Sequence, residues 1–318
     1  MYEGKTVGVV VPAHNEELLI GRTIETMPDY VDKIIVVNDK SDDRTAEVVR
    51  GYVARLPDRV VLIDLAENQG VGGSIAAGYR WARDHELEMT AVMAGDAQMD
   101  PDDLPALLDP IVQDKSDYTK GNRLFYGRAW HMIPKVRYLG NSGLSLLTKI
   151  VSGYWHIADS QAGYTVASLR TLKTLDLDKI FKRYGMPNDM LVKLNVYDFR
   201  VRDVYVKPVY NIGEKSGIRI GKVFFTIPML LLRLFFYRMI QKYVIRDFHP
   251  LILFYFFGAT LLFLDGLLVI RLIVLWIAFG SVPPITALAI LFCSTLGFQS
   301  LLFAMLFDME ANKDLKGD

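Results

Sequence analysis

The first hundred residues repeat one pattern four times: a short apolar run, a polar cluster, and a stretch with helical periodicity. The apolar runs occupy residues 6–11, 33–37, 60–65 and 90–93. Strands that alternate with helices at this pace predict a parallel, doubly wound α/β sheet. Because parallel strands point the same way, each strand would deliver its polar cluster to the same edge of that sheet.

The first three polar clusters are candidates for ligand binding. Their main members are His14, Glu16, Asp39, Asp43, Asn68 and Gly70. Each of these side chains would also suit a turn or a helix cap, and the glycines at 70, 72 and 73 would also suit close helix packing. The glycine spacing is not that of a dinucleotide-binding fingerprint. Four coincident clusters favour a shared site over four separate caps.

The fourth cluster follows the apolar run at residues 90–93, which is typical of a buried strand. It reads G-D-A-Q-M-D-P and contains Asp96, Gln98 and Asp100. Carboxylate and amide oxygens at the carboxyl end of a strand suit Mg²⁺ or Mn²⁺, and such a cation suits a diphosphate. The alternative is an acidic turn in which Asp100 caps a helix beginning near Pro101.

Composition excludes several classes of protein. With 36 basic and 36 acidic residues the formal net charge is zero, so a nucleic-acid partner is not expected. The single cysteine, Cys293, excludes an intramolecular disulfide, and no Cys/His zinc spacing occurs. We expect no secretory signal segment. Hydropathy changes sharply near residue 220, which predicts a catalytic domain in residues 1–220, amphipathic interfacial helices in 221–248 and a two-helix transmembrane anchor with a short cytosolic tail in 249–318.

Residues 224–245 are apolar but contain Arg233, Arg238 and Lys242. An arginine near mid-bilayer is costly, so we expect an interfacial helix whose basic side chains extend to the headgroups. Residues 250–270 and 285–307 are each long enough to cross a bilayer, with a turn at 280–284 between them.

Lysines and arginines flank this hairpin on both sides, which predicts a multi-pass protein of the cell membrane with its catalytic domain on the cytosolic side. Asp265 lies within the first span and Arg271 follows it, and either burial against a neighbouring helix or an approach to the far headgroups would accommodate them. These two residues make a homo-oligomer possible. The alternative is a buried helical pair in a soluble core.

The motifs V-V-P-A-H-N-E, V-N-D-K-S-D-D-R-T, N-Q-G-V-G-G and G-D-A-Q-M-D-P resemble the ordered motifs of family-2 glycosyltransferases with a GT-A fold. The polyprenyl-phosphate sugar synthases, such as dolichyl-phosphate mannose and glucose synthases, are the most similar type. The resemblance covers about the first 220 residues. It implies a UDP- or GDP-sugar pocket lined by Pro12, His14, Glu16, Asp39, Asn68, Gly70 and Asp96.

The resemblance also implies a metal site, because Asp96 matches the last acid of the family's D-x-D motif and Gln98 matches a glutamine that often follows it. Two positions depart from the family pattern. Ala94 stands where the first acid is usual, and Asn38 with Lys40 replaces the usual acid and glycine of the second motif.

Later motifs imply acceptor and catalytic residues. Arg123, in K-G-N-R, matches an element near the acceptor phosphate, and Arg137 is a second candidate unless it lies on a solvated helix face. Asp159 matches an acid under the donor sugar. Asp189 matches the family's aspartate base, although a helix N-cap would explain it equally well.

A glycine-flanked basic loop that includes Lys215 and Arg219 follows the last predicted strand, at residues 204–209. These two side chains suit a phosphate clamp, and they also suit contacts with anionic lipid headgroups.

The resemblance therefore implies a membrane-anchored inverting glycosyltransferase that moves a hexosyl or N-acetylhexosaminyl group from a nucleotide-sugar to a polyprenyl or dolichyl phosphate. One alternative is transfer to a lipid-diphosphate oligosaccharide or a polysaccharide, although the Q-x-x-R-W string of polysaccharide synthases is absent. A non-catalytic nucleotide-sugar-binding scaffold would suit Ala94. A nucleotidyltransferase would show a basic glycine-rich loop near the N-terminus, and none is seen.

Overall fold

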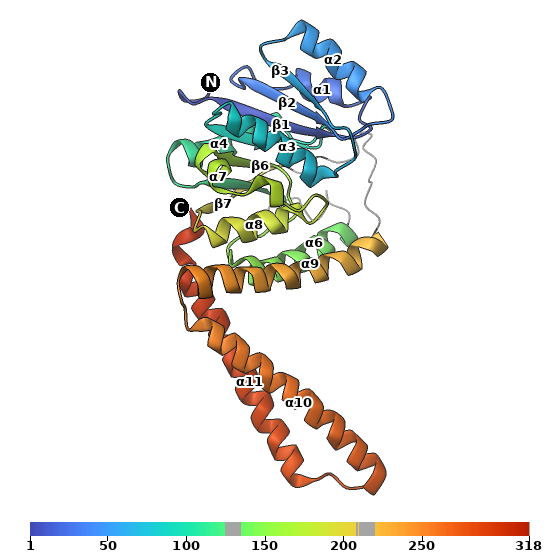
Figure 1. The fold of residues 1–318 in the computed structure, drawn as a ribbon, viewed down its shortest axis with the longest axis vertical. Helices are drawn as coiled ribbons and strands as arrows, with labels where there is room; N and C mark the ends of the chain where they lie inside the picture. The colour runs from blue at the N-terminus through green and yellow to red at the C-terminus, as the bar shows by residue number, and fades with distance from the viewer. Residues whose placement is uncertain (125–134, 208, 210–219, 318) are drawn as a thin grey trace. The chain divides into compact units, whose positions relative to one another are not determined.

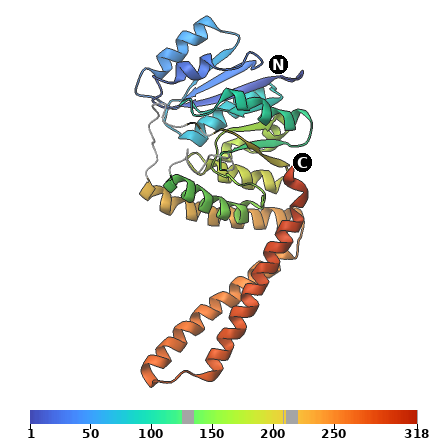
Figure 2. The same cartoon turned by 180° about the vertical axis from the view of Figure 1, so that it is seen from behind.

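The computed structural model describes residues 1–124, 135–207, 209 and 220–317, in two compact units (Figures 1 and 2). The α/β unit contains Met1–Phe235 and the tail segment Asp314–Asp318. The helical unit is Phe236–Lys313. The domain boundaries predicted at residues 220 and 248 stay predictions.

A seven-stranded sheet forms the centre of the α/β unit, with strand order β3-β2-β1-β4-β6-β5-β7. Its strands are β1 (Val7–Ala13), β2 (Lys33–Asn38), β3 (Val60–Asp64), β4 (Met89–Val92), β5 (Tyr118–Asn122), β6 (Thr165–Ser168) and β7 (Val201–Tyr205). β6 is antiparallel to both β4 and β5, and the other neighbouring pairs are parallel. The predicted mostly parallel, doubly wound sheet is confirmed.

Helices cover both faces of this sheet (Figures 1 and 2). Those of the α/β unit are α1 (Ile20–Glu25), α2 (Thr45–Arg55), α3 (Val71–Asp84), α4 (Leu104–Val112), α6 (Lys135–Ser152), α7 (Leu169–Thr174), α8 (Met186–Val196) and the first part of α9 (Ile220–Ile240). Short 3₁₀ turns lie at η1 (Pro101–Asp103), η2 (Leu177–Lys179) and η4 (Lys313–Lys316).

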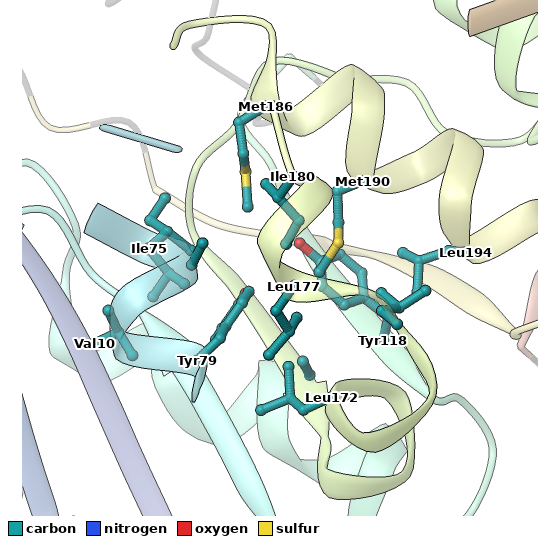
Figure 3. Packing of buried hydrophobic residues seen from close by; sticks show 14 of the residues in the cluster. Val10, Ile75, Tyr79, Tyr118, Leu172, Leu177, Ile180, Met186, Met190 and Leu194 are labelled. Carbon is teal, nitrogen blue, oxygen red and sulfur yellow. The ribbon is translucent and has the colours of Figure 1, made fainter. Parts of the chain in front are cut away.

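Successive side chains of β1 point to opposite faces of the sheet, and both faces are buried. Val7, Val9 and Val11 point into the cluster formed with α1, α2 and α4. Val10 points the other way, into the cluster formed with α3, α7 and α8. Figure 3 shows this second cluster, in which aromatic and methionine side chains fill the space between α3 and α8. A strand buried on both faces reads as a continuous apolar run, and this is what the sequence shows.

A third, smaller cluster attaches α6 and α9 to α8. Val151 of α6 and Val192 of α8 pack against Ile227, Leu230 and Leu231 of α9. The first part of α9 therefore belongs to the packed interior of the α/β unit.

The helical unit is a hairpin of α10 (Leu251–Phe279) and α11 (Pro284–Ala311), preceded by a π-helical segment, η3 (Gln241–Arg246). Both long helices are apolar and long enough to cross a membrane, and the apolar side chains of α10 are mostly exposed. A Cβ atom at Gly258 would lie 3.0 Å from the carbonyl oxygen of Gly297, so small residues permit close helix contact. Asp265 accepts a hydrogen bond from the Ser294 hydroxyl (2.9 Å), which agrees with the first alternative, that it faces a neighbouring helix.

The expectation that Arg233, Arg238 and Lys242 extend to the headgroups is wrong for Arg238 and Lys242. Arg238 is fully buried and donates to both carboxylate oxygens of Asp308 on α11, at 2.8 and 2.9 Å. Lys242 is also buried and donates to Asn312, while Tyr243 donates to Asp308. A buried arginine is tolerated because a carboxylate compensates its charge.

Two predictions of local structure differ from the fold. The last strand begins at Val201 and ends at Tyr205, whereas residues 204–209 were expected. β6 was not predicted, because it has only four residues and directly follows a polar motif. Its antiparallel direction places its first residue, Thr165, at the edge where the parallel strands end.

Candidate functional site

The polar clusters meet at one edge of the sheet, as the parallel order predicts. β1 lies between β2 and β4, with Ala13 paired to Asn38 and Val10 paired to Val92. Asp39 and the Asp96 loop therefore follow strands that end on either side of β1.

Asp39 organises the first part of this edge. Its side chain is 4 % exposed, and its two carboxylate oxygens accept the backbone N–H groups of Gln69 (2.6 Å) and Gly70 (2.8 Å). Its carbonyl oxygen lies 2.9 Å from Nδ1 of His14 and accepts a hydrogen bond from the Asn68 amide at 3.2 Å. Three clusters that are distant in sequence are thus joined at one point, which is where the resemblance predicts a nucleotide.

The glycines that follow are required for close packing. Gly70 has a φ of 77°, which favours glycine, and a Cβ atom there would lie 2.7 Å from the carbonyl oxygen of Lys182. A Cβ at Gly72 would lie 2.1 Å from the carbonyl oxygen of Phe181. The close-packing interpretation of these glycines is therefore confirmed, and it is compatible with a nucleotide contact at Gly70.

Asp96 and Gln98 lie in the loop after β4, and Asp96 is close enough to Glu16 to affect its charge. Burial, and then the carboxylates of Asp96 and Asp43, raise the pKa of Glu16 to about 7. Asp100 caps η1, as the capping alternative predicts, and Asp96 accepts the Gln98 N–H at 3.0 Å within the same acidic turn. A hollow at this place in the α/β unit is lined by Asp96, Gln98, Met99, Arg123, Ala162, Gly163, Tyr164, Val206, Lys207 and Val209.

The donor set fits a divalent cation that takes few protein ligands. Within the described parts of the chain, no three His, Cys, Asp or Glu side chains group as a metal site. The amide nitrogen of Gln98 is buried and has no hydrogen-bond partner among the described residues. Rotating the side-chain amide by 180° would therefore exchange its nitrogen and oxygen positions without breaking a hydrogen bond of that nitrogen. Asp96 and Gln98 would therefore supply two oxygens, and Mg²⁺ or Mn²⁺ would take the rest from phosphates and water.

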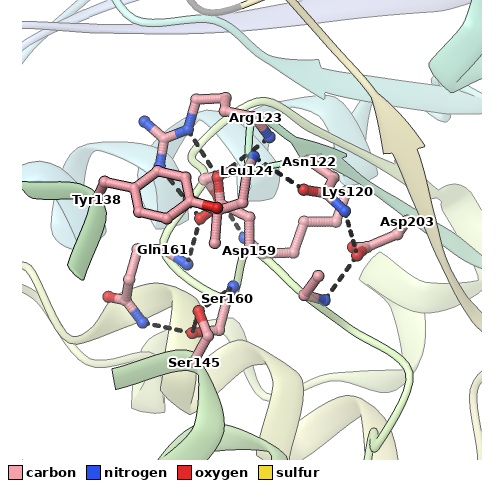
Figure 4. A network of polar contacts seen from close by, with 12 residues as sticks. Lys120, Asn122, Arg123, Leu124, Tyr138, Ser145, Asp159, Ser160, Gln161 and Asp203 are labelled. Carbon is pink, nitrogen blue, oxygen red and sulfur yellow. Dashed lines mark hydrogen bonds and ion pairs between the residues drawn. The ribbon is translucent and has the colours of Figure 1, made fainter. Parts of the chain in front are cut away.

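Arg123 and Asp159 form a bidentate pair (Figure 4). Nε of Arg123 donates to Oδ2 of Asp159 at 2.8 Å, and Nη2 donates to Oδ1 at 3.2 Å. The Asp159 side chain is fully buried, whereas the Arg123 side chain is 26 % exposed. Although burial pushes the pKa of Asp159 upward, the Arg123 guanidinium holds it below its ordinary value. In this arrangement Asp159 orients Arg123.

Sequence reasoning missed two charged neighbours of this pair, Lys120 and Asp203. Both lie on strands, and Asp203 accepts hydrogen bonds from the Asn122 amide (3.0 Å) and the Ala158 N–H (2.7 Å) (Figure 4). The buried Lys120 ammonium donates to the carbonyl oxygen of Ala162. Burial lowers the pKa of Lys120 to about 8 and raises that of Asp203 to about 6. The available signal was a lysine and an aspartate within short runs of strand-forming residues, Tyr118–Asn122 and Val201–Tyr205, because charges buried in a sheet need partners.

Asp189 lies in the first turn of α8, whose N-cap is Gly185, so the N-cap alternative is wrong. Its carboxylate accepts the Phe181 N–H at 2.8 Å and the Lys193 ammonium at 2.7 Å. Asp189 therefore holds the chain that precedes α8, and its role as a base stays a prediction.

The remaining predicted residues are placed less fully. The Pro12 carbonyl accepts the Gly95 N–H at 3.2 Å, which ties β1 to the loop of Asp96. The side chain of Arg137, and all of Lys215 and Arg219, lie outside the described residues.

Comparisons with known proteins agree with this arrangement. Residues 8–172 match the model of the family "Glycosyl transferase family 2". The chain is 28 % identical to a UDP-N-acetylglucosamine–dolichyl-phosphate N-acetylglucosaminyltransferase from Methanococcus voltae, over 71 % of this chain and 96 % of that protein. It is 30 % identical to an undecaprenyl-phosphate mannosyltransferase from Micrococcus luteus, over 67 % of this chain and 88 % of that protein.

A solved structure shares the fold. Glucosyl-3-phosphoglycerate synthase from Mycobacterium tuberculosis, in complex with Mn²⁺ and UDP-glucose, aligns with a TM-score of 0.54 at 20 % identity, over 73 % of this chain and 79 % of that one.

Proposed function

Because the chain belongs to glycosyl transferase family 2, we propose that it transfers a sugar from a nucleotide-sugar to the phosphate of a polyprenyl or dolichyl lipid. The observation that supports this most directly is the hollow that brings Asp96 and Gln98, expected at the donor diphosphate, together with Arg123, expected at the acceptor phosphate. The relatives with lipid-phosphate acceptors in their names support the acceptor class.

The reaction is a single displacement with inversion. An oxygen of the lipid phosphate forms a bond to the anomeric carbon while the bond from that carbon to the nucleoside diphosphate breaks. The acceptor phosphate is already ionised at neutral pH, so no residue has to remove its proton. The work of the protein is to hold two anions in attack geometry.

Each part of the sheet edge has a role in this proposal. His14, Asp39, Asn68 and Gly70 form the nucleotide end, and Arg123 is held by Asp159 at the acceptor end. A divalent cation at Asp96 and Gln98 would neutralise charge on the diphosphate leaving group.

The helical hairpin supports a membrane location for the acceptor. α10 and α11 are long and apolar enough to cross a bilayer, and polyprenyl phosphates reside there. We propose that the hairpin anchors the chain with the catalytic unit on the cytosolic side.

The acceptor is tested by incubating membranes that contain the protein with labelled UDP- and GDP-sugars and polyprenyl phosphate. Label is expected in the lipid-phosphate fraction. Label that appears instead on a protein or a polymer would show the acceptor assignment to be wrong.

The donor side is tested with Asp96→Ala, which we expect to lower turnover roughly a hundredfold or more because it removes charge stabilisation at the leaving group. Asp102→Ala is the matched control, since Asp102 is an exposed acid in the adjoining η1 turn. A chelator should also abolish activity, and Mg²⁺ or Mn²⁺ should restore it. Full activity in the chelator would exclude the metal.

A further inference from the structure

Lys207 follows β7 at the same edge of the sheet where Arg123 follows β5. The two strands are parallel neighbours, with Asn122 paired to Tyr205, and the Val206 N–H donates to the Asn122 carbonyl at 3.2 Å. Lys207 and Arg123 both line the hollow that contains Asp96 and Gln98. The sequence motifs did not single out Lys207.

The position of Lys207 is fixed through its backbone. Its N–H donates to Oδ2 of Asp103 at 2.8 Å, which attaches the residue to the η1 turn after the Asp96 loop. The side chain is exposed. Among the residues that the structure describes, its ammonium makes no hydrogen bond and no ion pair within 4 Å.

Arg123 and Lys207, the cations that the described residues contribute to the lining of the hollow, therefore differ in how far the protein balances their charge. The guanidinium of Arg123 is bonded at two nitrogens to the buried Asp159 carboxylate, so much of its charge is balanced within the protein. The Lys207 ammonium is attracted by the Asp103 carboxylate but forms no hydrogen bond with it, so more of its charge is available to a ligand than that of Arg123. A lysine presents three donors on a flexible stem and suits a phosphate oxyanion as a point charge.

We propose that Lys207 binds a phosphate oxyanion of a substrate in this hollow. The inference deepens the proposed function and rests on it, because both substrates carry phosphate there. The oxyanion belongs either to the diphosphate of the nucleotide-sugar or to the monophosphate of the lipid, and the experiment separates these sources.

The test compares Lys207→Gln and Lys207→Arg with Lys115→Gln in the full-length protein. Lys115 is an exposed lysine in the loop before β5, at the opposite edge of the same sheet, so its variant makes the same charge change away from the hollow. Binding of UDP, GDP and a short-chain polyprenyl phosphate is measured by calorimetry. KM and kcat are measured for both substrates.

We expect Lys207→Gln to weaken binding of one phosphate ligand by about tenfold or more, with Lys207→Arg close to wild type and Lys115→Gln unchanged. Weaker UDP or GDP binding with a higher donor KM identifies the diphosphate. Weaker lipid-phosphate binding with an unchanged donor KM identifies the acceptor.

Lys207→Gln that binds all three ligands like wild type would overturn the proposal, as would an equal loss in Lys115→Gln. Wild-type protein that binds none of the three would also overturn it. Failure of the proposed function is distinct from these results: the wild type would then bind a nucleotide but make no lipid-linked sugar, and the calorimetry would still test Lys207.

Discussion

Asp159 is the fully buried partner in its ion pair with Arg123, and Arg123 is the partly exposed one. This asymmetry matters because an arginine that loses its carboxylate can still reach water, whereas a carboxylate without its arginine is left buried. The pair therefore links the stability of the α/β unit to the orientation of the cation expected at the acceptor phosphate.

We predict that Arg123→Gln destabilises the protein more than Asp159→Asn does. The first variant leaves a buried carboxylate with Lys120 as its remaining nearby cation, which costs up to about 3–5 kcal/mol, and the second leaves a partly exposed guanidinium, which costs less. Thermal unfolding in detergent measures both, and Arg123→Gln/Asp159→Asn should recover part of the loss. The reverse order of the two single variants would contradict the prediction.

The pKa of Asp203, which burial raises to about 6, predicts a pH-dependent stability. Between about pH 4 and pH 6 the folded protein keeps a proton that the unfolded chain has lost, so the free energy of unfolding falls as pH rises. The loss from this group amounts to at most about 3 kcal/mol, since one pKa unit corresponds to roughly 1.4 kcal/mol.

Asp203→Asn isolates this contribution from the other carboxylates. The asparagine resembles the protonated aspartate and does not titrate. The melting temperature of the variant minus that of the wild type should therefore increase as pH rises from 4 to 7. A constant difference across this range would show that the pKa of Asp203 is not raised.

The sequence pattern predicts the sheet because the runs that form β1, β2 and β4 are apolar and buried on both faces, and helices of ordinary length separate the first four strands. The meeting of Asp39 with Asn68 follows from that parallel order. The pairing of Arg123 with Asp159 does not follow from the parallel order. These residues are 36 positions apart in the sequence, and they meet because β5 and β6 are neighbours in the sheet. A single sequence carries no signal for a short antiparallel strand inserted between parallel ones.

The glycines of two helices provide a matched pair of predictions. Gly72→Ala in α3 should destabilise the protein by roughly 1–3 kcal/mol, because its Cβ would lie 2.1 Å from the Phe181 carbonyl oxygen. Gly51→Ala in α2 should stabilise it by about 0.5–1 kcal/mol, because no atom lies within 4 Å of the new Cβ. Thermal unfolding of both variants provides the measurement, and similar effects of the same sign would contradict this packing.

The arginines of α9 look alike in the sequence, yet the structure separates Arg238 from Arg233. Arg238 and Asp308 are both fully buried and joined by two hydrogen bonds, whereas Arg233 is exposed. Arg238→Ala should therefore cost about 3–5 kcal/mol by leaving Asp308 uncompensated, and Arg233→Ala should change stability by about 0.5 kcal/mol or less. Arg238→Met/Asp308→Leu should restore part of the loss, because it removes both charges of the pair while Tyr243 and Asn312 lose Asp308 as an acceptor. Unfolding in detergent compares the three variants, and equal losses for the two single arginine variants would mean that the pair is not formed.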